Sequence, residues 1–169
     1  AARSMKYRSA AYLQMAQIYY KERKLDRAEK YARQSLDYNR YNTEAYLILA
    51  LIEKSKGNEQ KKNEILSSIL EIDPLNVFAN YEKQTFSVVM HFEMPHEIGL
   101  ELAIKYLNLG EKEEAVRILS KSAEHPIVKY WLAFLLDNQA ALDDAAVASP
   151  KLVYPFRNET AEVLTWALK

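Results

Sequence analysis

Apolar side chains recur at spacings of three and four residues through most of the chain, which is the pattern of helices with one buried face. Short polar turns interrupt this pattern, and two of them contain a single glycine, Gly57 or Gly110. Glycine at such a place suits a left-handed residue between two helices. Pro74 and Pro126 fall where one helix should end and the next begin. The pattern predicts an all-α chain of helices joined by tight turns.

The helical pattern repeats every 34 residues. Residues 9–42 align with residues 43–76 without a gap, and a third unit fits residues 96–127. Each unit is predicted to be a pair of antiparallel helices, which can bury its apolar faces only against a neighbour. Equivalent positions of the units carry residues of the same kind. They are aromatic at Tyr12 and Tyr46, small at Ala16, Ala50 and Ala103, and polar at Asn42 and Asn76.

Nineteen surplus residues separate the second unit from the third, because Gly57 and Gly110 lie 53 residues apart instead of 34. We predict that residues 77–95 form an inserted helix over 77–90 and a turn. Residues 128–169 are predicted to be C-terminal helices with an intervening loop over 138–157, whose first part, residues 138–150, is a loop or a short helical turn. An apolar helix that carries Trp166 reaches the end of the chain. We therefore expect one structural unit that is a fragment of a longer protein.

The residues of these units resemble tetratricopeptide repeats (TPRs). The third unit has the leucine–alanine pair, the aromatic residue and the turn glycine of that family at Leu102-Ala103, Tyr106 and Gly110. The first unit departs from the family with Arg23 in place of the turn glycine. The second has Lys62 and Ile69 in place of small residues. The resemblance implies a right-handed superhelical array of helix pairs, a TPR-like solenoid with an inserted helix and a C-terminal helical extension.

A longer stretch, about residues 40–169, is similar to a more particular group. The segments PHEIGLELAIKYLNLGEKEEAVRIL and SPKLVYPFRNETAEVLTWA carry this similarity. The group is the C-terminal TPR region of large bacterial proteins with an N-terminal β-rich, mutarotase-like domain. The resemblance implies a scaffold attached to a carbohydrate-related domain.

Composition narrows the function classes. The chain has no cysteine, which excludes disulfides and thiolate chemistry, and only three glycines, too few for a phosphate-binding loop. No apolar run approaches the roughly 20 residues of a membrane span. Basic and acidic residues number 23 each, but residues 1–42 hold 10 basic and only 4 acidic ones. This basic segment leaves a nucleic-acid binder as a weaker hypothesis, although solvated helix faces explain the same charges.

Three groups of residues could carry chemistry. His91, Glu93, His96 and Glu97 are close enough in sequence to suggest zinc, but Pro95 breaks any common helix face. The acidic pairs Glu113-Glu114 and Asp143-Asp144 could suggest glycosidic acid–base catalysis, which needs two carboxylates across a pocket. We interpret all three groups as structural or solvated, and predict no enzyme, no cofactor and no metal.

The resemblance implies a concave surface lined by the first helix of each unit. Its predicted interaction residues are Leu13, Gln17, Tyr20, Leu47, Leu51, Lys54, Leu100, Ile104 and Asn108. We expect a non-catalytic protein-interaction scaffold whose partner is a protein, a peptide or another domain of the parent chain. The alternative is an accessory helical module of a larger carbohydrate-active or carbohydrate-binding bacterial protein, used for orientation or oligomerisation. So many aliphatic side chains should be covered, either by residues 77–90 or 138–157 or by a docked partner.

Overall fold

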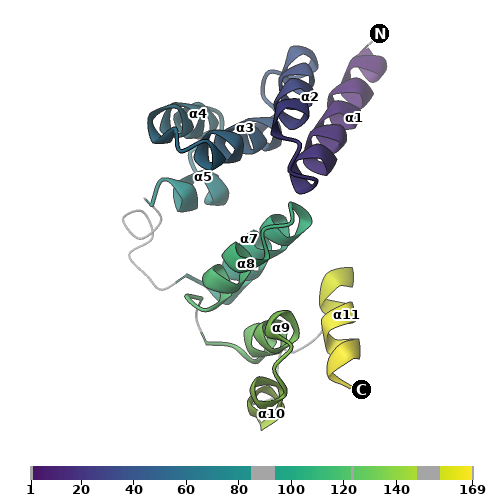
Figure 1. The fold of residues 1–169 in the computed structure, drawn as a ribbon, viewed down its shortest axis with the longest axis vertical. Coiled ribbons are helices and arrows are strands. Elements are labelled where there is room, and N and C mark those ends of the chain that lie inside the picture. The colour runs from purple at the N-terminus through teal and green to yellow at the C-terminus, as the bar shows by residue number, and fades with distance from the viewer. Residues whose placement is uncertain (1, 85–93, 123, 148–156, 169) are drawn as a thin grey trace. The chain divides into compact units, whose positions relative to one another are not determined.

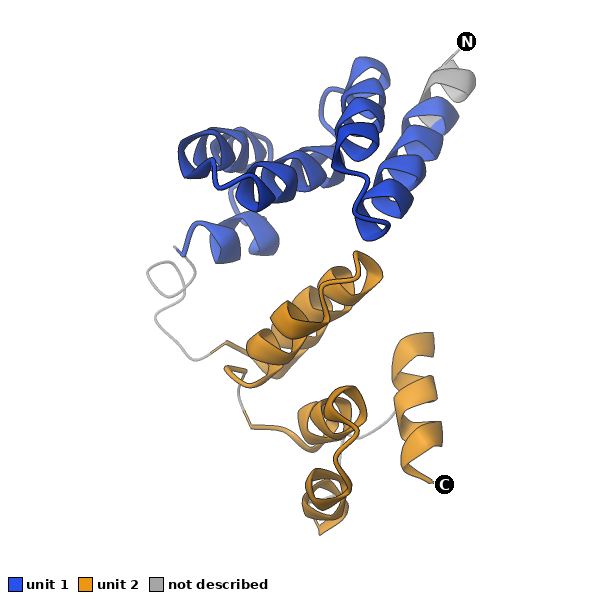
Figure 2. Cartoon of the chain, viewed as in Figure 1, with its two compact units in different colours: residues 1–90 blue, residues 91–169 orange. Residues whose placement is uncertain are grey.

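The computed structural model describes residues 2–84, 94–122, 124–147 and 157–168. The chain divides into two compact units, residues 1–90 and residues 91–169 (Figure 2). The described residues form helices joined by turns, with one isolated bridge between Met94 and Ser122 and no strand. The prediction of an all-α chain is confirmed for this part of the sequence. No helix within the described ranges has both the length and the apolar composition to cross a membrane.

In its described part, residues 2–84, the first unit forms two consecutive helix pairs and a short fifth helix (Figure 1). The first pair packs α1 against α2, and the second packs α3 against α4. These pairs coincide with the predicted repeats 9–42 and 43–76. The helices are α1 (Ala2–Lys21), α2 (Leu25–Tyr38), α3 (Thr43–Ser55), α4 (Glu59–Ile72) and α5 (Val77–Glu82).

Helix α1 crosses α2 closely because small residues meet at the crossing. The Ser9 hydroxyl donates to the backbone carbonyl of Ser35 at 3.0 Å, and the Ser35 hydroxyl donates to the carbonyl of Ser9 at 2.9 Å. Both serines are buried, as are Ala16 and Ala32. The Asn42 amide also donates to the Ser35 hydroxyl at 3.0 Å. At this crossing, small side chains and reciprocal hydrogen bonds thus take the place of the large interlocking side chains of an ordinary helix contact.

Helix α3 is the core of the first unit. Every residue from Leu47 to Glu53 is buried, so the helix is covered on all sides. A helix that is apolar around its whole circumference is typical of such an interior position. It contacts both helices of the preceding pair, α1 and α2, as well as its own partner α4.

The predicted helix over 77–90 is shorter than expected. Helix α5 ends at Glu82, and Gln84 adopts a left-handed conformation with φ 58° that terminates it. Residues 85–93 lie outside the described residues. Asn76 caps α5 through the N–H of Ala79, as Asn42 caps α3 through the N–H of Ala45, 34 residues earlier. The segment therefore begins in the register of a third repeat, and only departs from it after α5.

The described residues of the second unit form two further helix pairs and one more helix. Helix α7 packs against α8, α9 packs against α10, and α11 packs against α9 (Figure 1). Trp131 of α9 lies edge-on to Phe134, which lies edge-on to Trp166 of α11. The helices are α7 (His96–Asn108), α8 (Lys112–Leu119), α9 (Pro126–Leu136), α10 (Gln139–Val147) and α11 (Asn158–Ala167).

The loop predicted over 138–157 is wrong for its first half. Residues Gln139–Val147 form α10, which pairs with α9 in a hairpin of the same kind as the predicted units. Residues 148–156 lie outside the described residues. The alanine- and aspartate-rich sequence resembled a loop because its apolar side chains are small; Ala145 is nevertheless buried against the rest of the unit.

A left-handed residue stands at the turn of each helix pair. These residues are Arg23, Gly57, Gly110 and Asp137, with φ between 49° and 82°. Two of the four are therefore not glycine, and a side chain in this conformation costs roughly 1–2 kcal/mol. Arg23 lies 34 positions before Gly57 and adopts the same left-handed backbone conformation.

We predict that Gly57→Ala lowers the free energy of unfolding by about 1 kcal/mol, because the left-handed backbone disfavours a Cβ atom. No neighbouring atom lies within 4 Å of the position that this Cβ would occupy, so the cost is conformational and not steric. Urea unfolding followed by circular dichroism measures it. Gly57→Asn, which tolerates this conformation better, should lose less; an equal loss for both variants would contradict the conformational explanation.

Candidate functional site

The structure divides the predicted concave residues into buried and accessible groups. Tyr20, Leu47, Leu51 and Ile104 are at most 5 % exposed, so they are not available to a partner in this arrangement. The aliphatic positions Leu47, Leu51 and Ile104 were expected to be covered, and they are buried in the cores of their units. Intermediate or full exposure remains at the other five: Leu13, Gln17, Lys54, Leu100 and Asn108.

Helix α5 packs against α4 and forms an ion pair with α3. The Lys54 ammonium of α3 lies 2.8 Å from a carboxylate oxygen of Glu82 on α5, and the Glu82 side chain is 3 % exposed. Phe78, one turn earlier on α5, is fully buried. The residues predicted as an insertion thus hold a predicted groove residue in an ion pair. Lys54 keeps an exposed fraction of 36 % in its side chain.

The four residues considered as metal ligands are only partly described. His96 and Glu97 lie in the first turn of α7, and His91 and Glu93 lie outside the described residues. His96 instead stacks on His125, with ring centroids 3.8 Å apart and parallel planes. Among the described residues, no group of three histidine, aspartate or glutamate side chains is placed to hold a metal ion. Only the tertiary structure brings these two histidines together.

The environment of His125 favours its neutral ring. Burial lowers the pKa of His125, the charge of His96 lowers it further, and Glu97 acts in the opposite direction. The His125 Nδ1 atom accepts a hydrogen bond from the N–H of Ile127 at 3.2 Å, which caps α9. By accepting this hydrogen bond at Nδ1, the His125 ring acts as the cap at the start of α9.

The two acidic pairs occupy ordinary helical positions. Glu113 and Glu114 lie in the first turn of α8, where carboxylates offset the helix dipole, and Glu114 accepts from Arg117 at 2.6 Å. Asp143 and Asp144 lie on the exposed side of α10. Asp143 accepts from the side chain of Gln139 at 3.2 Å. Both pairs therefore fit the structural interpretation.

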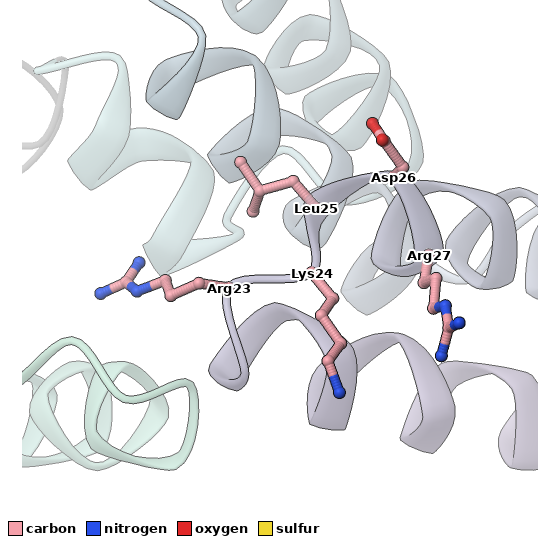
Figure 3. A pocket seen from close by; sticks show the side chains of 5 residues that line it. All are labelled: Arg23, Lys24, Leu25, Asp26 and Arg27. Carbon is pink, nitrogen blue, oxygen red and sulfur yellow. The ribbon is translucent and has the colours of Figure 1, made fainter.

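A hollow of about 410 Å³ lies at the turn between α1 and α2. Figure 3 shows that its side chains diverge: Arg23 points one way, Lys24 and Arg27 another, and Asp26 a third. Chemistry on a substrate needs polar groups that converge on one point. The hollow is consequently a basic turn open to water and not an active-site pocket. Its lining residues are Arg23, Lys24, Leu25, Asp26 and Arg27.

Four tyrosines from α1 and α2 stack alternately along the first hairpin, and we call them the tyrosine ladder: Tyr38, Tyr12, Tyr31 and Tyr19. Successive ring centroids are 5.3–6.1 Å apart, with interplanar angles of 8–21°. All four tyrosines are partly exposed. Basic side chains lie over the rings at 5.5–5.9 Å, within cation–π distance: Arg8, Lys24, Arg27 and Lys30.

Glu29 joins the first helix pair to the second. Its carboxylate accepts from Lys56 at 2.7 Å and from Arg33 at 2.8 Å. The hydrogen bond from Lys56, followed by the one from Arg33, lowers the pKa of Glu29 to about 2. Lys56 also lies 3.8 Å from the buried Glu53, so charges of α2 and α3 form one network between the repeats.

We predict that this network makes stability pH-dependent between about pH 4.5 and 2. The folded pKa of Glu29 is lowered, so its contribution is present above the unfolded pKa and is lost as the pH falls through about 2. Lys56 and Arg33 are accessible to water, which limits the contribution to about 1 kcal/mol. Urea midpoints of the wild type and Glu29→Gln should converge near pH 2. A difference that stays constant from pH 5 to pH 2 would contradict this assignment.

Comparison with known proteins adds no relative. No protein family matches the chain, and no curated protein matches it. The resemblance to tetratricopeptide repeats therefore rests on the quoted residues and on the helix pairs. The chain is identified at the level of its architecture, as an all-helical array of consecutive antiparallel helix pairs.

Proposed function

We propose that the helix pairs are tetratricopeptide-type repeats and that the chain is a non-catalytic scaffold for protein interaction. The observation that carries this proposal is the 34-residue spacing of equivalent structural positions. Arg23 and Gly57 are left-handed turn residues 34 positions apart, and Asn42 and Asn76 are helix caps with the same offset. Arrays of such hairpins present extended surfaces for proteins and peptides.

The accessible concave residues are the proposed contacts, and each unit contributes its own patch. Leu13 and Gln17 lie one turn apart on α1, and Leu100 and Asn108 lie on α7. The buried residues of the predicted groove, such as Leu47, act as support within the core. A mixture of aliphatic and amide side chains suits a peptide that buries apolar side chains and hydrogen-bonds through its backbone.

A peptide selection tests the proposal. The full chain, residues 1–169, is immobilised and challenged with a displayed library of random peptides, and the enriched peptide is titrated by fluorescence anisotropy. Gln17→Arg should weaken a peptide that binds the first unit by about tenfold or more, and Leu100→Arg should do the same for a peptide that binds the second unit. Gln60→Arg, on the exposed side of α4, is the matched control and should leave the affinity within about twofold. Circular dichroism confirms that each variant is folded.

Two results would contradict the proposal. The first is a library that yields no peptide retained above a control helical bundle. The second is a peptide whose affinity is equally affected by Gln60→Arg and by the two concave variants.

A further inference from the structure

The His96–His125 stack connects two consecutive helix pairs of the second unit. His96 is the first residue of α7, and His125 is the N-cap of α9. The two rings are parallel, with centroids 3.8 Å apart, so the beginnings of α7 and α9 meet through this contact. Neither histidine belongs to the proposed peptide contacts, and the function proposed above leaves the stack without a role.

The His125 ring caps α9 through a hydrogen bond that requires its neutral form. The Nδ1 atom accepts from the N–H of Ile127 at 3.2 Å, so in the neutral ring the proton is on Nε2. A protonated imidazole carries N–H groups on both nitrogens and accepts no hydrogen bond. Protonation of His125 therefore removes the cap and sets two N–H donors against each other.

Two helix N-termini lie at the stack, since α7 begins at His96 and α9 begins after His125. A helix N-terminus carries a partial positive charge, which disfavours a cation. Burial of the His125 ring acts in the same direction, because it penalises the charged form. If His96 is protonated as well, two like charges lie at the distance of ring contact.

Among the described residues, the groups whose charges act on His125 are His96 and Glu97. Burial has the largest influence and lowers the pKa of His125, His96 lowers it further, and Glu97 raises it. The Glu97 side chain is 72 % exposed, with a carboxylate oxygen 3.3 Å from Nδ1 of His96. Glu124 adjoins His125 in the sequence, but its carboxylate lies 2.7 Å from the ammonium of Lys129. The carboxylate that favours the protonated ring is thus exposed to water, which weakens its effect.

We propose that the His96–His125 stack is a pH-sensitive joint, which holds the beginnings of α7 and α9 together when His125 is neutral and loosens them when it is protonated. At neutral pH the stack and the cap of α9 are both present. In mild acid the cap is lost, the first turn of α9 frays, and the junction with α7 opens. Helices α7 and α8 remain paired, as do α9 and α10, because their packing extends along the helices beyond the rings.

The lowered pKa of His125 sets the direction of the effect. The ordinary pKa of histidine is 6.5, and the folded value lies below it. Between these two values the unfolded chain binds more protons than the folded chain. The contribution of the joint to stability is therefore complete above pH 6.5 and is lost as the pH falls below it. This window is separate from that of Glu29, whose lowered pKa acts below about pH 4.5.

His125→Asn tests the joint, because asparagine supplies a cap acceptor that does not titrate. Urea unfolding of the full chain at pH 7.5 and at pH 5 gives the folding equilibrium constants. The ratio of the wild-type constant to that of His125→Asn should fall by about fivefold between these pH values, as for a helix that loses its N-cap. Glu124→Gln, at a neighbouring position whose side chain is 80 % exposed, is the matched control. Its ratio to the wild type should stay within about twofold.

Two further measurements locate the change. At pH 5.5, amides at the start of α9 should exchange with deuterium several-fold faster in the wild type than in His125→Asn, while those of α3 should exchange equally in both. In the wild type alone, the ring C–H signals of His125 in NMR should titrate with a midpoint below 6.5, and the Ile127 amide signal should shift with the same midpoint.

Each of the following outcomes would overturn the proposal. The ratio of the wild type to His125→Asn could be the same at both pH values. Glu124→Gln could remove the pH dependence as fully as His125→Asn, which would assign it to the carboxylate. Exchange at pH 5.5 could rise equally in α3 and α9, which would indicate a general loss of stability without a joint. The His125 ring could titrate at or above 6.5.

Discussion

Leu51→Asp is expected to lower the free energy of unfolding by about 4 kcal/mol, the largest effect among these predictions. Leu51 is 3 % exposed and lies in the segment of α3 that is covered on all sides. The substitution removes a buried aliphatic side chain and places a carboxyl group where water does not reach it. The lost apolar burial and the buried carboxyl group both lower the free energy of unfolding.

Urea unfolding followed by circular dichroism measures the loss, with Leu75→Asp as the matched control. Leu75 is 76 % exposed between α4 and α5, so the same chemical change there should alter stability by less than about 0.5 kcal/mol. Burial raises the folded-state pKa of the introduced carboxyl group, so part of the lost stability should return as the pH falls toward about 4, the pKa of the unfolded state. If Leu51→Asp is as stable as Leu75→Asp, the side chain faces solvent and the groove is open after all.

The second large effect is expected for Gly99→Ala, which should destabilise the protein by about 2 kcal/mol. A Cβ atom at this position would lie 1.9 Å from the Ser122 hydroxyl oxygen and 2.8 Å from the Ser122 Cβ atom. Rotation of the serine side chain relieves only the first of these contacts. Helix propensity alone gives the opposite sign, because alanine is favoured over glycine in a helix by about 1 kcal/mol.

A double-mutant cycle with Ser122→Gly isolates the contact. The Gly99→Ala substitution should cost at least about 1 kcal/mol less in the Ser122→Gly background than in the wild type. The measurement is again the urea midpoint of the full chain. A cost that is independent of residue 122 would show that α7 and the end of α8 do not approach each other at Gly99.

The helix pairs themselves follow from local sequence. The 3.6-residue period, the turn residues and the caps act within a few positions, so the bounds of α3, α4, α7 and α8 could be predicted closely. The 34-residue repeat also predicted which helices pair, because two helices joined by a short turn pack against each other. The end of α5 and the existence of α10 were missed. Small apolar residues and a left-handed Gln84 give weak local signals.

The candidate surfaces were decided by tertiary packing. Leu47, Leu51 and Ile104 were predicted as groove residues from their repeat positions, but all three are buried in the cores of their units. The tyrosine ladder and the His96–His125 stack each join residues that are far apart in the sequence, so no local sequence pattern could predict these contacts. Sequence by itself determined which residues form helices and how those helices pair, because periodicity and turn geometry are local. Which apolar side chains are covered depends on neighbouring helices, and only the folded chain brings these together.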